Sequence, residues 1–265
     1  MTSFLMRFKK GNMQKSMIEG NTLKLILNFS IPLLLGNLFQ QFYNVVDAAI
    51  VGQTLGSKAL AAVGASSSVQ FLILGFCMGI CQGFAIMVSQ SFGAKKLDEM
   101  HTYIYAGAIW TAITAFVVSI LVVVFCADIL HILQVNDEIF KDAYAYLVVI
   151  FAGIPFTLLY NYLSAILRAI GDSKTPFLFL AFSAFLNIGL DFFCILVLKW
   201  GCAGAAIATI FAQAVSGILC LLLIAFKVNV LHIPKSSRYV DKQHSLKLLA
   251  MGVPMGLQFS ITAIG

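Results

Sequence analysis

Charge is the scarcest property of this sequence, since Asp, Glu, Lys and Arg together make up 11% of its 265 residues. A soluble domain has about 25%, and a soluble fold with so little charge would present too few polar groups to water. Hydrophobic residues reach 60%, and the mean hydropathy is +0.95. The composition therefore excludes an ordinary soluble domain and predicts a chain that is surrounded by lipid.

Several long stretches contain no Lys, Arg, Asp or Glu at all: residues 59–94, 102–127, 143–167, 200–226 and 248–265. Two further stretches, 25–57 and 175–198, carry one acid each, Asp47 and Asp191. A spanning helix needs about 20 apolar residues, and these runs lack the alternation of membrane strands. We predict an all-α membrane protein with spans near residues 25–50, 62–90, 103–126, 143–165, 176–198, 203–226 and from 246 onward.

Basic residues are distributed unevenly between the two sides of these spans. With the N-terminus inside, fourteen Lys and Arg fall on the inner side and three, Lys58, Lys141 and Lys199, on the outer side. This bias predicts a multi-pass protein of the plasma (inner) membrane with a cytoplasmic N-terminus. It also explains the net charge of +6 through topology, so we expect no nucleic-acid partner.

Motifs that carry chemistry are scarce as well. Cys77 and Cys81 lie one helical turn apart, without His or carboxylate neighbours at metal-ligand spacing, and the other four cysteines are mostly within spans. We interpret all six as small packing residues. Because no nucleophile–base set and no G-x4-G-K-[ST] motif is present, we expect no enzyme, no cofactor and no use of ATP.

A weak internal repeat suggests the organisation of the chain. The first span contains Pro32, and a similar apolar segment contains Pro254, 222 residues later. We expect a second repeat of the same orientation to begin near residue 245. The sequence stops in mid-span, so we expect a truncated form of a longer chain; the alternative is a natural half-size protein that dimerises. The predicted parts are a cytoplasmic segment 1–24, a six-helix lobe 25–226, a cytoplasmic connection 227–245 and the start of a seventh span 246–265.

A polar stripe interrupts the first predicted span. On a helix, Asn37, Gln40, Asn44 and Asp47 fall within an arc of roughly 80°. In contact with lipid, these amides and the acid would lose water without gaining partners, at a cost of several kcal/mol. The stripe is therefore expected to face protein or a water-filled cavity.

The fifth and sixth predicted spans repeat this arrangement. Ser183, Asn187 and Asp191 follow one another at four-residue intervals, and Thr209 and Gln213 share a face of the next span. At 1.5 Å per residue, the two acids and the threonine lie about 8–12 Å below the outer boundary. The plainer interpretation is that each is an interfacial residue with a structural role.

No Lys or Arg within the spans can pair with the two acids. A buried carboxylate without a cationic partner favours a bound proton or a bound cation. Asp, Asn and Thr oxygens are suitable hard ligands for Na⁺. The sequence thus predicts a proton site or a Na⁺ site formed by Asp47, Asn187, Asp191 and Thr209.

The order of several short motifs resembles the multidrug and toxic compound extrusion (MATE) transporters over essentially the whole chain. These motifs are DAAIVGQTLG at 47–56, SQSFGA at 89–94, LRAIGDSKTP at 167–176, Asn187-x3-Asp191, and the segment 201–209. The resemblance implies twelve helices in two six-helix lobes with rocker-like alternating access. This chain would supply the N-lobe and the start of the C-lobe.

The resemblance also implies the members of a cation-coupling site. Besides the four residues of the polar cluster, it adds Tyr43 from the first span and Tyr146 and Asn161 from the fourth. The two fourth-span assignments rest on spacing alone. The remaining polar residues, Asn37, Gln40, Asn44 and Gln213, are candidates for the substrate cavity.

The function expected from these residues is secondary antiport. Organic, often cationic, compounds would leave the cell in exchange for H⁺ or Na⁺, with the lipid bilayer and small organic substrates as partners, and the full-length protein would be a monomer that needs its C-lobe. The alternative transporter is a lipid-linked precursor flippase, whose cavity should present Arg or Lys. A channel or a membrane scaffold is the other class, and coupled flux with fixed stoichiometry would separate it from an antiporter.

The segment LRAIGDSKTP has two interpretations. In the first it is loop architecture, in which Gly171 ends one helix, Thr175 caps the next before Pro176, and Arg168 and Asp172 form a surface pair. In the second it takes part in gating on the cytoplasmic side.

Overall fold

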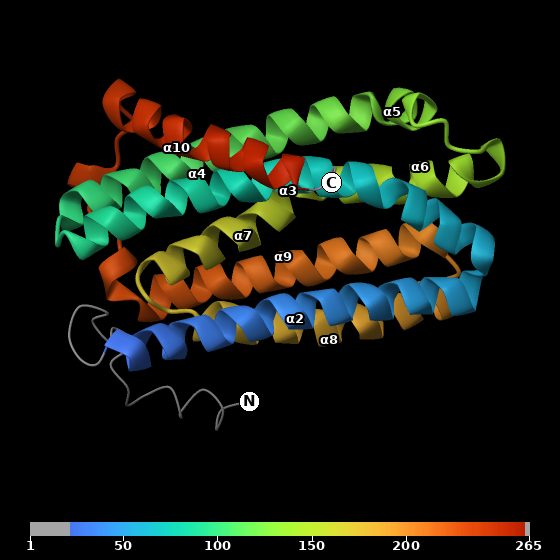
Figure 1. The fold of residues 1–265 in the computed structure, drawn as a ribbon, viewed down its shortest axis with the longest axis horizontal. Helices are drawn as coiled ribbons and strands as arrows, with labels where there is room; N and C mark the ends of the chain where they lie inside the picture. Colours follow the sequence, from blue (N-terminus) through green and yellow to red (C-terminus); the bar gives the residue numbers. More distant parts are fainter. Residues whose placement is uncertain (1–21, 263–265) are drawn as a thin grey trace.

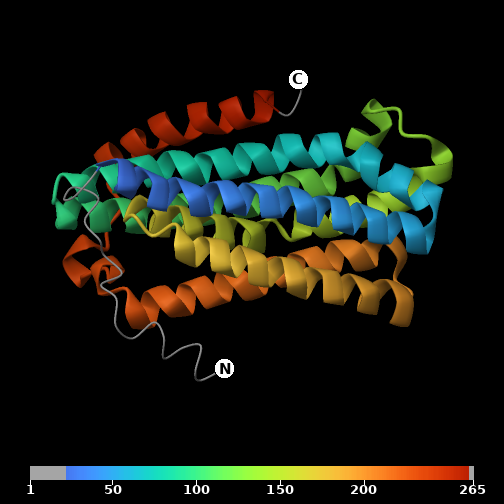
Figure 2. The same cartoon turned by 60° about the horizontal axis from the view of Figure 1, so that its bottom comes forward.

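The computed structural model describes residues 22–262, which form helices and no strands (Figures 1 and 2). The structure therefore confirms the predicted all-α fold class. Most of the predicted segment 1–24 lies outside the described residues. The α-helices are α2 (Thr22–Leu55), α3 (Ser57–Gly93), α4 (Leu97–Val124), α5 (Cys126–Ile132), α6 (Asp137–Ala152), α7 (Ile154–Ala169), α8 (Lys174–Phe192), α9 (Gly201–Lys227) and α10 (Lys242–Ile261).

The long helices run side by side along the long axis of the molecule (Figure 1). Helices α2, α8 and α9 contact one another, and α3 contacts α4 and α10. Helices α6 and α7 contact both α3 and α9, so they connect these two groups. The polar residues of the first, fifth and sixth predicted spans are thereby brought into one group of helices.

Within the described residues, five helices are long and apolar enough to cross a membrane: α2, α3, α4, α8 with the π-helical segment after it (Phe193–Val197), and α9. The bent pair α6–α7 would make a sixth. Helix α10 is not among them, so the seventh span stays a prediction, as do the limits of the predicted lobe and connection.

The fourth predicted span is broken instead of continuous. Helices α6 and α7 meet at Gly153 with a bend of 48°. Pro155 has no N–H to donate, so it fits the first turn of a new helix but not the interior of a long one. Gly153 is required for a second reason, because a Cβ there would collide with the side chain of Ile210. The two site candidates of the fourth predicted span therefore lie on different helices, Tyr146 on α6 and Asn161 on α7.

The segment LRAIGDSKTP differs from the expectation in two details. Helix α7 ends at Ala169, and Gly171 has φ = +91°, which suits glycine. Asp172, and not Thr175, caps α8, because its Oδ1 accepts hydrogen bonds from the backbone N–H of Lys174 at 3.2 Å and of Thr175 at 3.0 Å. The expected Arg168–Asp172 pair is also wrong, since none of the ion pairs in residues 22–262 joins them.

Helix α10 packs on α3 through glycines, and their backbones come unusually close. A Cβ on Gly79 would lie 2.5 Å from the Met255 carbonyl oxygen, and one on Gly83 would lie 2.6 Å from Gly252 Cα. Such contacts are typical of small residues spaced by four in membrane helices. The glycines of α3 thus allow the backbone of α10 to approach this closely.

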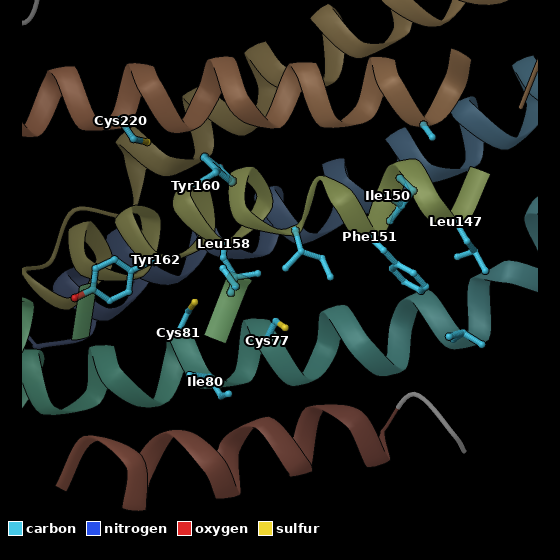
Figure 3. Close-up of a cluster of buried hydrophobic side chains, with 14 of the residues drawn as sticks. Cys77, Ile80, Cys81, Leu147, Ile150, Phe151, Leu158, Tyr160, Tyr162 and Cys220 are labelled. Carbon is cyan, nitrogen blue, oxygen red and sulfur yellow. The ribbon is translucent and has the colours of Figure 1, made fainter. Parts of the chain in front are cut away.

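The apolar core lies between α3, α6, α7 and α9 (Figure 3). Cys77 and Cys81 of α3 and Cys220 of α9 are buried there with Leu158 and Phe151, and all six cysteines are unpaired. The cysteines therefore act as small core residues, and this rigid core supports the polar cluster on its α2–α8–α9 side.

Candidate functional site

Two buried aspartates form the centre of the candidate site. Asp47 of α2 is 9% exposed, and Asp191, near the end of α8, is 0% exposed. Their carboxyl groups are within hydrogen-bonding reach of each other. Oδ1 of each has no hydrogen-bond partner among the described residues. Because two carboxylates cannot share a hydrogen bond unless one of them is protonated, this geometry suits a single bound proton or a cation between them.

Asn187 and Thr209 extend the acid pair toward α9. The Asn187 amide lies 3.2 Å from Thr209 Oγ1. With its nitrogen turned toward Asp191, it donates to Oδ2 at 3.2 Å, and its oxygen accepts from the hydroxyl and the backbone N–H of Thr209, each at 3.2 Å. This orientation satisfies both neighbours, so Asn187 links the carboxylate to α9.

Two tyrosines lie beside the acids. The hydroxyl of Tyr43, on α2, is within hydrogen-bonding reach of Thr209. Tyr146, on α6, is 4% exposed and close to both Asp47 and Asp191. Its hydroxyl is within hydrogen-bonding reach of Gln70 on α3, a residue without a predicted role. Four helices besides α3 thus supply the candidate ligands: α2, α6, α8 and α9.

Asn161 is placed differently from the other coupling candidates. Its Nδ2 donates to the Thr157 carbonyl at 2.8 Å within α7. Its side chain lines a large cavity of about 1100 Å³ instead of contacting the acid pair. The 48° bend between α6 and α7 separates it from Tyr146, and spacing along the sequence could not show that bend.

The large cavity lies between α2, α3 and α7, with Phe259 of α10 at its side. Its polar lining residues are Asn37, Gln40, Gln82, Ser89, Lys95, Asn161 and Arg168. Two of the four residues predicted for the substrate cavity, Asn37 and Gln40, therefore line this cavity. Neither Asp47 nor Asp191 contributes to the lining, so the acids and this cavity are separate places in the structure.

The other two predicted cavity residues lie elsewhere. Asn44 is exposed and lines neither of the two cavities described here. Gln213 lines a second, much smaller cavity of about 10 Å³ between α2, α8 and α9. Lys95 and Arg168, which line the large cavity, were outside the predicted spans, and only their place in the fold shows that they reach it.

Electrostatically, the acid pair has no compensating cation in the described part of the chain. The ion pairs there join Lys58 to Glu138, Lys96 to Glu99 and His244 to Asp241. No group of three or more His, Cys, Asp or Glu residues in that part could hold a metal ion. A cation at the acid pair would therefore be held by two carboxylates with neutral oxygens around them.

Comparison with known proteins gives the family. A family model described as MatE matches residues 32–193. The chain belongs to the MatE family. It is 33% identical over 250 residues to the probable multidrug resistance protein YpnP of Bacillus subtilis, covering 93% of this chain and 55% of YpnP. It is 29% identical over 243 residues to the probable multidrug resistance protein YoeA of the same organism, covering 89% and 52%.

Solved structures show the same fold. An outward-facing MATE family multidrug transporter of the MOP superfamily superposes with a TM-score of 0.88 at 24% identity, over 96% of this chain and 56% of that one. A MATE structure in a bent conformation gives 0.82 at 26% identity, over 90% and 53%. The MatE chain spans about half the length of the curated relatives it matches. This share of their length agrees with a six-helix lobe and the start of a seventh helix. Membership of a family of multi-span transporters also places the chain in a cell membrane.

Proposed function

We propose that this chain forms the ion-coupling half of a secondary antiporter that exports organic compounds in exchange for H⁺ or Na⁺. The observation that carries this proposal is the contact between Asp47 and Asp191, which are buried together without a cation. Two like charges in one dry place repel strongly unless a proton or a metal ion lies between them. The pair therefore has two states, occupied and empty, and the difference can drive a conformational change.

Occupancy of the acid pair acts first on the contact between α2 and α8. A proton or Na⁺ between the carboxyl groups holds Asp47 against Asp191, and its loss pushes the two helices apart. Helix α2 also contributes Asn37 and Gln40 to the large cavity. A movement of α2, with a bend at Pro32 inside the helix, would thus change the shape of that cavity.

The direction of transport follows from the predicted topology. With the N-terminus in the cytoplasm, the acids lie in the outer half of the membrane, so the ion enters from outside. One charge that moves down a potential of 100 mV supplies about 2.3 kcal/mol, enough for roughly a 50-fold concentration gradient of a neutral exported compound. The acids bind the ion, and the organic compound leaves when the second lobe and this one rock apart.

The large cavity is the proposed place of the organic compound. Its volume of about 1100 Å³ is at the upper end for small-molecule sites. Amides alternate there with Phe29, Met78 and Phe92, a mixture that suits loose recognition. The matched relatives named for multidrug resistance or export support this class of substrate and do not favour the lipid-linked precursor flippase. Lys95 and Arg168 do give the cavity the basic residues expected of a flippase.

The test is efflux by the full-length protein in proteoliposomes, with a fluorescent cation as substrate and with the proton and Na⁺ gradients collapsed separately. We expect Asp47→Asn and Asp191→Asn each to lower coupled efflux about 100-fold, because the neutral amide cannot release an ion. Asp137→Asn, an exposed acid in the first turn of α6, is the matched control and should leave efflux unchanged. Normal gradient-driven efflux by Asp47→Asn would remove the acid pair from the mechanism.

A further inference from the structure

The small cavity of about 10 Å³ next to the acid pair has a composition of its own. Its volume is about that of one water-sized guest. Its polar lining comes from three helices: Gln40, Tyr43, Ser183, Asn187, Thr209 and Gln213. None of these lining residues carries a charge, so the polar groups of the cavity are neutral amides and hydroxyls.

Gln213 shows what kind of guest this cavity accepts. Its Oε1 is inaccessible to solvent and has no hydrogen-bond partner among residues 22–262. A buried acceptor without a partner costs free energy, so buried polar atoms in proteins are nearly always paired. Because Oε1 can only accept, its partner must be a hydrogen-bond donor or a cation.

The small cavity adjoins both of the places already described. On one side it is lined by Thr209 and by Asn187, and Asn187 is hydrogen-bonded both to Thr209 and to Asp191. On the other side, Gln40 lines both the small cavity and the large one. The polar lining of the small cavity thus borders the acid pair at Asn187 and the large cavity at Gln40.

We propose that the small cavity is a transfer station for the coupling ion between the acid pair and the large cavity. Its guest is a single small particle bound by neutral oxygens, either the Na⁺ ion itself or one water molecule that passes the proton on. This inference rests on the proposed antiport. It assigns to Gln213 and Gln40 a role in the ion path, whereas the sequence placed both in the substrate cavity.

Neutral ligands suit a station of this kind. A carboxylate would bind the ion tightly and keep it there, whereas amide and hydroxyl oxygens hold it more weakly than the acid pair does. The ion is therefore stored at Asp47 and Asp191 and only passes through the small cavity. Gln40 lines both cavities, so the proposed path of the guest passes this side chain.

The experiment compares the speed of exchange with binding at equilibrium in the full-length protein. Gln213→Leu removes the orphaned acceptor and keeps similar volume. We expect it to lower the turnover of coupled exchange in proteoliposomes about tenfold, while ion binding to the acid pair at equilibrium stays within about twofold of wild type. Binding is measured with ²²Na⁺ for sodium and with a pH-sensitive dye for protons, and the probe that responds identifies the guest.

A matched pair of variants on α2 sharpens the test. Gln40→Leu should slow exchange as Gln213→Leu does, whereas Gln41→Leu, on the exposed side of the same helix and outside both cavities, should leave it unchanged. The proposed transfer station would be refuted if Gln213→Leu exchanged at the wild-type rate. It would also be refuted if Gln41→Leu slowed exchange as much as Gln40→Leu does. If Gln213→Leu does not fold, Gln213→Met and the α2 pair decide the same question.

The outcome also separates this inference from the antiport on which it rests. If Asp47→Asn abolishes exchange and Gln213→Leu does not affect it, the acid pair couples transport without the station. If Asp47→Asn exchanges normally, the proposed function fails and the station fails with it. Loss of equilibrium ion binding in Gln213→Leu, equal to that in Asp191→Asn, would instead make Gln213 part of the acid site.

Discussion

The two sides of this lobe are held together in opposite ways. On the α2–α8–α9 side, polar groups meet in the membrane interior, and Oδ1 of Asp47, Oδ1 of Asp191 and Oε1 of Gln213 have no partner in the described chain. On the α3–α10 side, the helices meet through the backbones of Gly79 and Gly83 on α3 and of Met255 and Gly252 on α10. Polar contacts change when an ion binds or leaves, whereas backbone contacts between glycines do not. In the proposed antiporter, the first side switches and the second serves as a fixed support.

The largest expected effect tests whether the polar side works as one unit. Asp47→Asn and Asp191→Asn should each lower coupled efflux about 100-fold, and the double variant should lose little more than either alone, because groups that act together are not additive. The measurement is efflux from proteoliposomes in a double-mutant cycle. Losses that multiply in the double variant would mean that the two acids act independently.

The glycine side should respond through stability. In Gly83→Ala the new Cβ would meet the backbone of Gly252 on α10 at 2.6 Å, so we expect a loss of about 1–3 kcal/mol in the free energy of unfolding. Thermal unfolding in detergent measures it. Gly64→Ala on the same helix has nothing within 4 Å of the new Cβ and should be neutral or slightly stabilising. Equal melting temperatures for the two variants would contradict close packing of α3 and α10.

A smaller effect is expected at the end of a helix on the polar side. Asp172→Ala removes the cap of α8 and should cost about 1 kcal/mol of stability, while Asp172→Asn keeps an acceptor oxygen and should cost less. Coupled efflux should survive in both, since the cap is remote from the acid pair in the fold. Unchanged unfolding of Asp172→Ala would show that the two capping hydrogen bonds are not formed in the membrane.

The smallest effect on stability is expected at the exposed ion pair between α3 and α6. Lys58 Nζ lies 2.8 Å from Glu138 Oε2, but the side chains are 70% and 65% exposed. Lys58→Ala should therefore change the free energy of unfolding by less than about 1 kcal/mol, and high salt should remove the difference. A larger, salt-resistant loss would mean that this ion pair is shielded in the bilayer.

Much of the helical framework was predictable because lipid imposes a simple rule on composition. The apolar runs locate α2, α3, α4, α8 and α9 to within several residues. The break between α6 and α7 was missed, although Gly153 and Pro155 signal it, because the run of apolar residues continues across both. The cap of α8 was misassigned because Asp172 and Thr175 are both good capping residues, and local sequence does not say which one the chain uses.

The polar cluster was predictable from the sequence, but the residues that line the two cavities were not. Asp47, Asn187, Asp191 and Thr209 were expected together, and the structure places them in contact. Asn161, Gln40 and Gln213 were assigned by spacing, and the structure distributes them over the large cavity and the small one. Helical spacing says which side chains share a face, but it does not say what lies opposite that face.

The sequence by itself determined that this protein is embedded in lipid, that it is helical, and that two acids lie within its spans. Those properties follow from the cost of placing charge and unpaired backbone groups in hydrocarbon. Only the tertiary structure decided that Gln40 adjoins two cavities, that Asn161 lies away from the acid pair, and that α10 rests on the glycines of α3. Contacts between helices far apart in the chain depend on how whole surfaces fit, and no single stretch of sequence contains that information.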